Sequence, residues 1–274
     1  MIQSFDPTQL SVGDLQTLLQ NAVAPRPIAF ASTIDKDGNP NLSPFSFFNV
    51  VSSDPPILLF SPARKGENGG LKDTYFNIKE VPEVVINMVN FDLVEQMSLS
   101  SVSYAKGVNE FEKAGLTALP SDLVRPFRVK ESPVQFECVV QQVIELGTAA
   151  GAGNLMLCLV KKIHVHTSIL DTNGQIDPFL IDLVGRMGGP YYVRTVKEAL
   201  FQIPKPLGIM AMGIDQLPNH IKHSPYLTGN ELARLGGVEA LPTPTGKEPK
   251  AIDFEEAKKC IEAGNIWDAF ALLY

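Results

Sequence analysis

The sequence lacks the features that mark membrane and secreted proteins. No apolar run approaches the roughly 20 residues that a membrane-spanning helix requires. Residues 1–6 show no basic segment followed by an apolar one, as a secretory signal would. We therefore expect a cytoplasmic protein that does not insert into a membrane.

Cysteine is scarce, and its spacing excludes two kinds of site. Cys138, Cys158 and Cys260 are odd in number, widely separated and without a Cys-x-x-Cys pair. Neither a disulfide scaffold nor a structural zinc site fits this pattern. We expect buried, unreactive thiols.

Positive charge and glycine-rich motifs are also in short supply. The 23 lysines and arginines are outnumbered by 30 acidic residues, which gives a net charge of -7 and argues against a nucleic-acid-binding surface. Neither a Gly-x-Gly-x-x-Gly nor a Gly-x-x-x-x-Gly-Lys-Ser/Thr motif is present, so a dinucleotide-binding domain is not expected. No Gly-x-Ser-x-Gly elbow indicates a serine nucleophile.

The chain has many strand-forming segments. Asp-Gly within residues 35–39 lies between two extended runs and predicts a hairpin. Helices are expected at 15–22, 73–78 and 93–101. Strands, rich in β-branched residues, are expected at 28–34, 41–51, 57–60, 83–89, 127–129, 134–146 and 155–167. Adjacent strands with few helices favour a mainly β fold, a closed or partly open barrel with peripheral helices.

The character of the chain changes after Phe201, where prolines and the pair Gly236–Gly237 interrupt it. We predict a domain at 1–201 and a C-terminal extension at 202–274. The extension ends in two short helices separated at residues 263–265. We expect it to pack on the barrel or on a partner subunit, where it supports the assembled particle or shapes the entrance of the pocket.

Hydroxyl and amide side chains gather along the predicted strand at 41–51 and just beyond it. They are Ser43, Ser46, Asn49, Ser52 and Ser53. Beside apolar strand residues they suit a ligand with a flat ring and a polar, anionic tail. The alternative is local hydrogen bonding at a strand end, where serine and asparagine are common.

Cations close to a helix start form a second candidate element. Lys72 and Thr74 could bind a phosphate together with the free N–H groups of the following helix, while Asp73 would cap that helix or hold a cation. Simple capping is the alternative. Arg64 and Arg26 could each fork onto a phosphate or remain solvated. The prolines on both sides of Arg26 also suit it to fixing a strand entrance.

Two further groups of residues have both a functional and a structural interpretation. Residues 185–192, with Arg186, form a glycine-rich loop that either borders a flat ligand or makes a tight turn before core tyrosines. His164 and His166 share one face of a strand, as in a two-histidine metal platform. No carboxylate or third histidine accompanies them at a useful spacing, and His220 and His223 add none, so we predict no metal site.

Three segments together resemble the flavin reductase-like, FMN-binding split-barrel family. They are the two-strand block at residues 24–33 and 41–61, the Lys-Asp-Thr-x-x-Asn signature at 72–77 and the loop at 185–192. The resemblance implies a Greek-key split β-barrel and a homodimer with the flavin site near the subunit interface. The FMN-binding residues that it implies are Ser46, Asn49, Val50, Val51, Ser52, Ser61, Arg64, Lys72, Thr74, Asn77 and Arg186.

The same resemblance implies an FMN-dependent oxidoreductase. NADH or NADPH would be a transient electron donor, and a small molecule or a protein the acceptor. No side chain need act as an acid or base, because FMN supplies the redox chemistry. A non-enzymatic, flavoredoxin-like electron carrier is the main alternative. The Lys-Asp-Thr signature makes a split-barrel oxidase for another substrate, or a heme-associated relative, less attractive.

Overall fold

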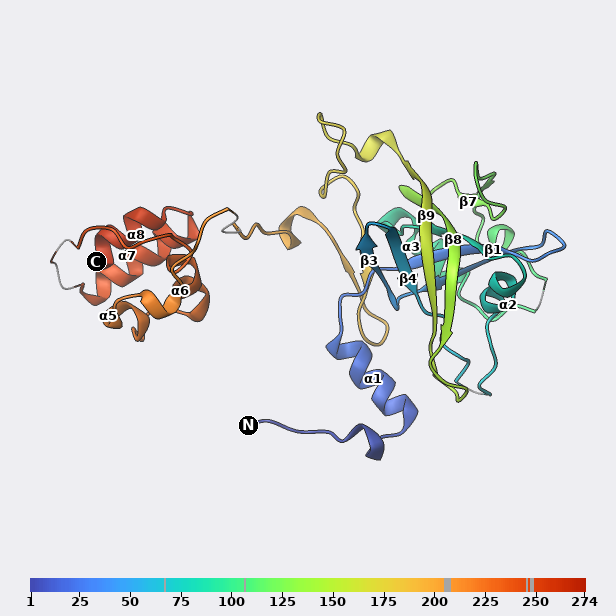
Figure 1. The fold of residues 1–274 in the computed structure, drawn as a ribbon, viewed down its shortest axis with the longest axis horizontal. Helices are drawn as coiled ribbons and strands as arrows, with labels where there is room; N and C mark the ends of the chain where they lie inside the picture. Colours follow the sequence, from blue (N-terminus) through green and yellow to red (C-terminus); the bar gives the residue numbers. More distant parts are fainter. Residues whose placement is uncertain (67, 106, 205–207, 245, 247–248) are drawn as a thin grey trace. The chain divides into compact units, whose positions relative to one another are not determined.

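The computed structural model describes residues 1–66, 68–105, 107–204, 208–244, 246 and 249–274. The chain forms two compact units, Met1–Leu200 and Phe201–Tyr274. The first contains a β-sheet with short helices, and the second is helical (Figure 1). In the described part of the chain, no helix is both long and apolar enough to cross a membrane.

A single large sheet organises the first unit. Its seven strands are all antiparallel to their neighbours, in the order β2-β1-β5-β8-β9-β4-β3. They are β1 Ala29–Ile34, β2 Pro40–Phe45, β3 Phe48–Ser53, β4 Pro56–Phe60, β5 Glu83–Asn87, β8 Val134–Glu145 and β9 Asn154–Val165. The predicted β-sheet with peripheral helices is confirmed for this unit, and the hairpin at residues 35–39 joins β1 to β2.

Smaller elements surround this sheet. Two short ladders pair β6 Ala118–Leu119 with β7 Arg128–Val129, and β10 Val184–Arg186 with β11 Tyr192–Arg194. The helices of this unit are α1 Val12–Ala22, α2 Asp73–Glu80, α3 Val94–Leu99 and α4 Glu110–Lys113.

The sheet curls but does not close. β2 and β3 follow each other in sequence, yet they form the two opposite edges. The ring of Phe45 on β2 lies 5.5 Å from that of Phe60 on β4, and the Ser61 N–H donates to the Phe47 carbonyl at 2.9 Å. The two edges therefore approach each other at Ser46–Phe47 without a ladder between them in the described residues.

This break corrects the prediction of one strand over residues 41–51. The alternation of apolar and polar residues cannot show that the chain stops pairing with β1 at the end of β2 and then pairs with β4 through β3 at the other edge of the sheet. The chain turns at Ser46–Phe47, and it is this corner that leaves a gap in the sheet wall.

Apolar residues fill both faces of β1. Ala29 and Ala31 face a core inside the curled sheet, whereas Ile28 and Phe30 face a second core beneath α3 and α4. Because both faces are covered, every residue of β1 is buried. Burial of this kind contributes about 25 cal/mol for each Å² of apolar surface, so packing between the two cores stabilises β1 beside the site.

The second unit has an apolar core of its own. Its helices are α5 Asn219–Lys222, α6 Gly229–Leu235, α7 Ala251–Glu262 and α8 Ile266–Leu273. They bury Ile221, Leu235 and Phe270 completely. α7 and α8 end and begin where two helices were predicted, and the turn between them contains Gly264 at a φ of +83°.

Candidate functional site

A surface pocket opens at the corner between β2 and β3. It has a volume of about 230 Å³. Its lining residues are Gln16, Gln20, Ser43, Pro44, Phe45, Ser46, Phe47, Ser61, Ala63, Lys72 and Ser101. Four residues proposed from the sequence, Ser43, Ser46, Ser61 and Lys72, therefore meet here. Three hydroxyls and an ammonium group beside aromatic rings suit a ligand with an apolar plane and an anionic tail.

Arg26 builds the corner from behind the pocket. Its Nε donates to Ser46 Oγ at 3.3 Å, Nη2 donates to the Met187 carbonyl at 3.0 Å, and Nη1 donates to the carbonyls of Gln20 and Val23. Burial, with a smaller contribution from Arg186, lowers the pKa of Arg26. Arg26 thus connects the end of α1 and the loop after β10 to the pocket rim, which fits the proposal that it fixes the strand entrance.

The start of α2 brings Lys72 to the pocket. Lys72 is the N-cap residue, with extended backbone, and its ammonium group has no hydrogen-bond or ion-pair partner among the described residues, so it is available to a ligand. Asp73 is the first helical residue. The predicted capping by Asp73 is therefore wrong, because the helix starts at Asp73 itself and Lys72 occupies the N-cap position, but the charge of Asp73 still complements the helix dipole.

Several of the proposed binding residues lie away from this pocket. Thr74 is fully buried and accepts from Asn41 Nδ2 at 3.4 Å, while Asn77 donates to Thr33 Oγ1 at 3.2 Å. Arg186 lies over the ring of Tyr192, 4.6 Å from its centroid, and donates to the Tyr191 carbonyl. The remaining proposed residues outside the lining are Asn49, Val50, Val51, Ser52 and Arg64.

Other lining residues were missed by sequence reasoning. Gln16 and Gln20 lie four residues apart on α1, a spacing that places both on one helix face. That spacing was a readable signal, although nothing linked it to the β2–β3 corner. Ser101 follows α3 and offers no comparable pattern.

A second pocket differs sharply in charge. Its volume is about 350 Å³, and its lining includes five carboxylates, those of Asp35, Asp37, Asp73, Glu80 and Glu110. Burial, with a smaller contribution from Asp73, raises the pKa of Glu110. Carboxylates repel a phosphate, so the pocket at Lys72 is the better candidate for an anionic ligand.

A comparison with models of protein families shows which family the chain belongs to. Residues 22–182, more than half of the chain, match the model of the flavin reductase like domain. The chain belongs to the flavin reductase like family. Ser43, Ser46, Ser61 and Lys72 all lie within the matched region, whereas Gln16, Gln20 and Arg186 lie outside it.

Relatives and solved structures cover the same part of the chain. An uncharacterized protein of Aquifex aeolicus is 39% identical over 192 residues, which are 69% of this chain and 94% of that protein. Nitrilotriacetate monooxygenase component B from Bacillus cereus is 28% identical, with a TM-score of 0.69 over 74% of this chain and 99% of its own. 2-Nitrobenzoate 2-nitroreductase of Pseudomonas fluorescens is 25% identical, with a TM-score of 0.65 over 74% of this chain and 96% of its own.

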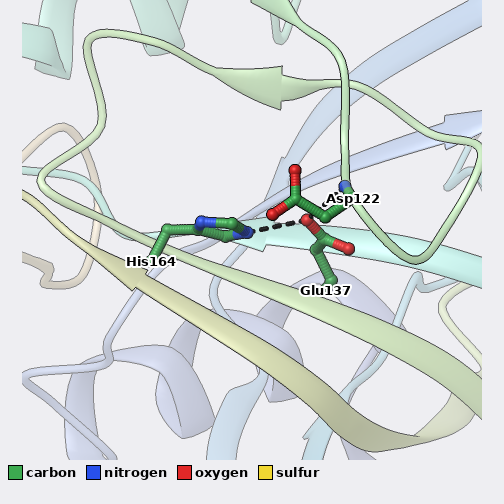
Figure 2. Close-up of side chains that lie close together, drawn as sticks. All are labelled: Asp122, Glu137 and His164. Carbon is green, nitrogen blue, oxygen red and sulfur yellow. Dashed lines mark hydrogen bonds and ion pairs between the residues drawn. The ribbon is translucent and has the colours of Figure 1, made fainter.

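Elsewhere in this flavin reductase like domain, His164 has carboxylate neighbours that the sequence did not reveal. Figure 2 shows His164, Glu137 and Asp122 close together, and their ligand atoms lie within 4.8 Å of one another. His164 Nε2 lies 2.7 Å from Glu137 Oε1. The expectation that no carboxylate accompanies His164 is therefore wrong, because β8 and β9 pair residues distant in sequence.

Glu137 is fully buried, and its bonds indicate a structural role. It accepts from the Asp122 N–H at 2.8 Å and from the Leu123 N–H at 2.6 Å, and Arg128 Nε lies 3.9 Å away. Burial alone would raise the pKa of Glu137, but these N–H donors and His164 together lower it. Lys162 pairs with Asp122. The group thus ties the loop around Asp122 to the sheet.

Proposed function

We propose that this protein binds FMN at the β2–β3 corner and acts as an oxidoreductase, with NADH or NADPH as transient electron donor. The observation that carries the proposal is the meeting of Ser43, Ser46, Ser61 and Lys72 in one pocket of a flavin reductase like domain. Two structures that the chain resembles are named as a monooxygenase component and a nitroreductase, both redox proteins.

The residues of the pocket fit the two ends of FMN. Lys72 and the N–H groups at the start of α2 would hold the phosphate. Phe45, Phe47 and Pro44 offer apolar surface to the flavin ring, and Ser43, Ser46 and Ser61 offer hydroxyls to its polar edge. When bound, FMN would supply the redox chemistry by taking up a hydride and passing electrons to an acceptor.

We also propose that two copies of the chain complete the site. The pocket of about 230 Å³ is below the roughly 300–1,000 Å³ of sites that enclose a small ligand. Beside it, α1 has no buried residue, and Val50 and Val51 on the edge strand β3 are 61% and 53% exposed. A helix with exposed Leu18 and Leu19 and an open sheet edge are surfaces that a second copy can cover. The proposed residues Asn49, Val50, Val51 and Ser52 on β3 would then lie at the interface.

A spectroscopic titration tests the function. The flavin-free protein is titrated with FMN, FAD and riboflavin, and the loaded protein is then mixed with NADH or NADPH without oxygen. We expect FMN to bind in preference to riboflavin and its absorption to bleach rapidly. Equal affinity for riboflavin and FMN would contradict a phosphate anchor. Slow bleaching by both nucleotides, with fast reduction by a protein donor, would identify an electron carrier instead of a reductase.

A further inference from the structure

The segment between β4 and α2, residues 61–72, delivers Ser61 and Lys72 to the pocket, and Arg64 lies within it. Arg64 was proposed from the sequence as a phosphate ligand. Its guanidinium group is engaged elsewhere. Nε donates to the Gly147 carbonyl at 3.2 Å, Nη1 donates to the Gly69 carbonyl at 3.3 Å, and Nη2 forms an ion pair with Glu145 Oε2 at 3.1 Å.

The backbone around Arg64 is bound to the same neighbour, the turn between β8 and β9. The Arg64 N–H donates to the Ala152 carbonyl at 2.8 Å, and the Gly151 N–H donates to the Arg64 carbonyl at 3.3 Å. Asn154 Nδ2 donates to the Pro62 carbonyl at 2.8 Å. These hydrogen bonds therefore fix the segment against the turn between β8 and β9.

Glu145 extends the connection to α2. The Tyr75 hydroxyl donates to Glu145 Oε1 at 2.6 Å, while Glu145 Oε2 pairs with Arg64. Tyr75 is 7% exposed and lies in the first turn of α2, three residues after Lys72. One carboxylate at the end of β8 thus holds both the middle of the segment and the helix at its far end.

We propose that Arg64, Glu145 and Tyr75 form a clamp that positions Lys72 for the phosphate and Ser61 for the polar edge of the flavin ring, with Arg64 as a positioning residue. This inference rests on the proposed function. A guanidinium group paired with a carboxylate has its charge largely compensated. An anion would have to compete with Glu145 for it, whereas Lys72 has no such partner among the described residues.

Replacement of Glu145 distinguishes a phosphate-ligand role of Arg64 from a positioning role, because the two roles predict different changes in FMN affinity. If Arg64 were the phosphate ligand, Glu145→Gln would release it and leave FMN affinity unchanged or higher. If the clamp positions Lys72, the same variant lowers FMN affinity, and we expect a loss of roughly tenfold. Tyr75→Phe keeps the Arg64 ion pair and should give a smaller loss. Glu95→Gln, an exposed glutamate of α3, is the control for net charge.

A double variant tests whether the residues act as a unit. In an Arg64→Met background, Glu145→Gln should change the FMN dissociation constant by less than about twofold, because the Arg64 ion pair is already absent and the glutamine amide oxygen can still accept from the Tyr75 hydroxyl. Independent, multiplying effects of the two substitutions would overturn the proposal. So would tighter FMN binding by Glu145→Gln alone.

Hydrogen exchange of the flavin-free protein gives a readout that does not need the ligand. Peptides covering residues 61–72 and 146–153 should exchange faster in Arg64→Met and Glu145→Gln than in the wild type, with the strands β1 and β5 unchanged. Unchanged exchange in both peptides would overturn the clamp. A wild-type protein that binds no flavin would refute the proposed function, while the exchange rates would still decide whether the clamp exists.

Discussion

At the scale of single residues, Lys72 is the one cation among the described residues that line the corner pocket. A charged hydrogen bond to phosphate contributes about 1.5–3 kcal/mol, or roughly ten- to hundredfold in affinity. Lys72→Met should weaken FMN binding by this factor and leave riboflavin binding unchanged. Fluorescence titration with both flavins measures it. Lys79→Met, at the other end of α2, is the matched control. Equal losses for the two flavins would place Lys72 away from the phosphate.

Thr74 belongs to the Lys-Asp-Thr motif in sequence, but its side chain does not face the pocket. The sequence placed it beside Lys72 as a ligand, but a helix turns by about 100° per residue, so neighbours in sequence face different directions. The structure buries Thr74 beside Asn41. Its side chain is proposed here to stabilise the fold, while its backbone N–H remains near the start of α2.

Glu137 should control stability in a pH-dependent manner. The folded protein lowers its pKa below the ordinary value of 4.5, so the ionised carboxylate stabilises the fold above that value. This stabilisation is lost as pH falls through the folded pKa. Glu137→Gln leaves Arg128 and His164 without their buried partner and should cost about 3 kcal/mol at pH 7.

Urea unfolding at pH 7 and at pH values below 4.5 measures this prediction. The difference in unfolding free energy between wild type and Glu137→Gln should shrink toward the acid end, because both side chains are then neutral. Glu112→Gln, an exposed residue of α4, should show little effect at either pH. A constant difference across the range would mean that packing, not charge, accounts for the loss.

At the scale of elements, α1 contacts the rest of its unit at few points, and Gly188 is one of them. A Cβ atom at Gly188 would overlap the side chain of Asn21, which is itself bonded to the Thr17 carbonyl. The overlap involves the far end of the Asn21 side chain, so Gly188→Ala should push that side chain away, loosen the contact between α1 and the loop after β10, and weaken FMN binding slightly. The double variant Asn21→Ala/Gly188→Ala removes the overlap and should recover most of the affinity. Titration of both variants decides whether α1 contributes to the site.

Local patterns revealed most strands and helices but not the corner that makes the site. The Asp-Gly hairpin, the helix at α2 and the break before α8 follow from turn chemistry and periodicity. The end of β2 at Phe45 does not, because residues 41–51 remain strand-like throughout while the pairing partner changes. Pairing between β8 and β9 likewise brought Glu137 to His164, and Glu145 to the pocket segment through Arg64. Long-range pairing is not encoded in a local pattern, so these neighbours could not be predicted.

At the scale of the whole molecule, the uncovered surfaces of α1 and β3 predict a homodimer. Light scattering at micromolar concentration should give twice the mass of one chain. The double variant Val50→Glu/Val51→Glu places like charges on the exposed edge strand of each copy. We expect it to shift the protein toward the monomer and, at the same time, to weaken FMN binding. A stable monomer of the wild-type protein with FMN bound would contradict the dimer and the shared site.

The helical unit at Phe201–Tyr274 should be dispensable for flavin binding. Its core is formed by its own residues, such as Ile221 and Phe270, while the family match ends at residue 182 and every lining residue of the pocket precedes 102. A chain ending at residue 201 should therefore fold, dimerise and retain FMN. Its thermal stability or its choice of acceptor should change where the unit supports the assembly. A protease site inserted at residue 202 allows cleavage after folding, so that aggregation of a truncated chain cannot obscure the result. If the cleaved, dimeric domain loses all affinity for FMN, part of the cofactor site belongs to the helical unit.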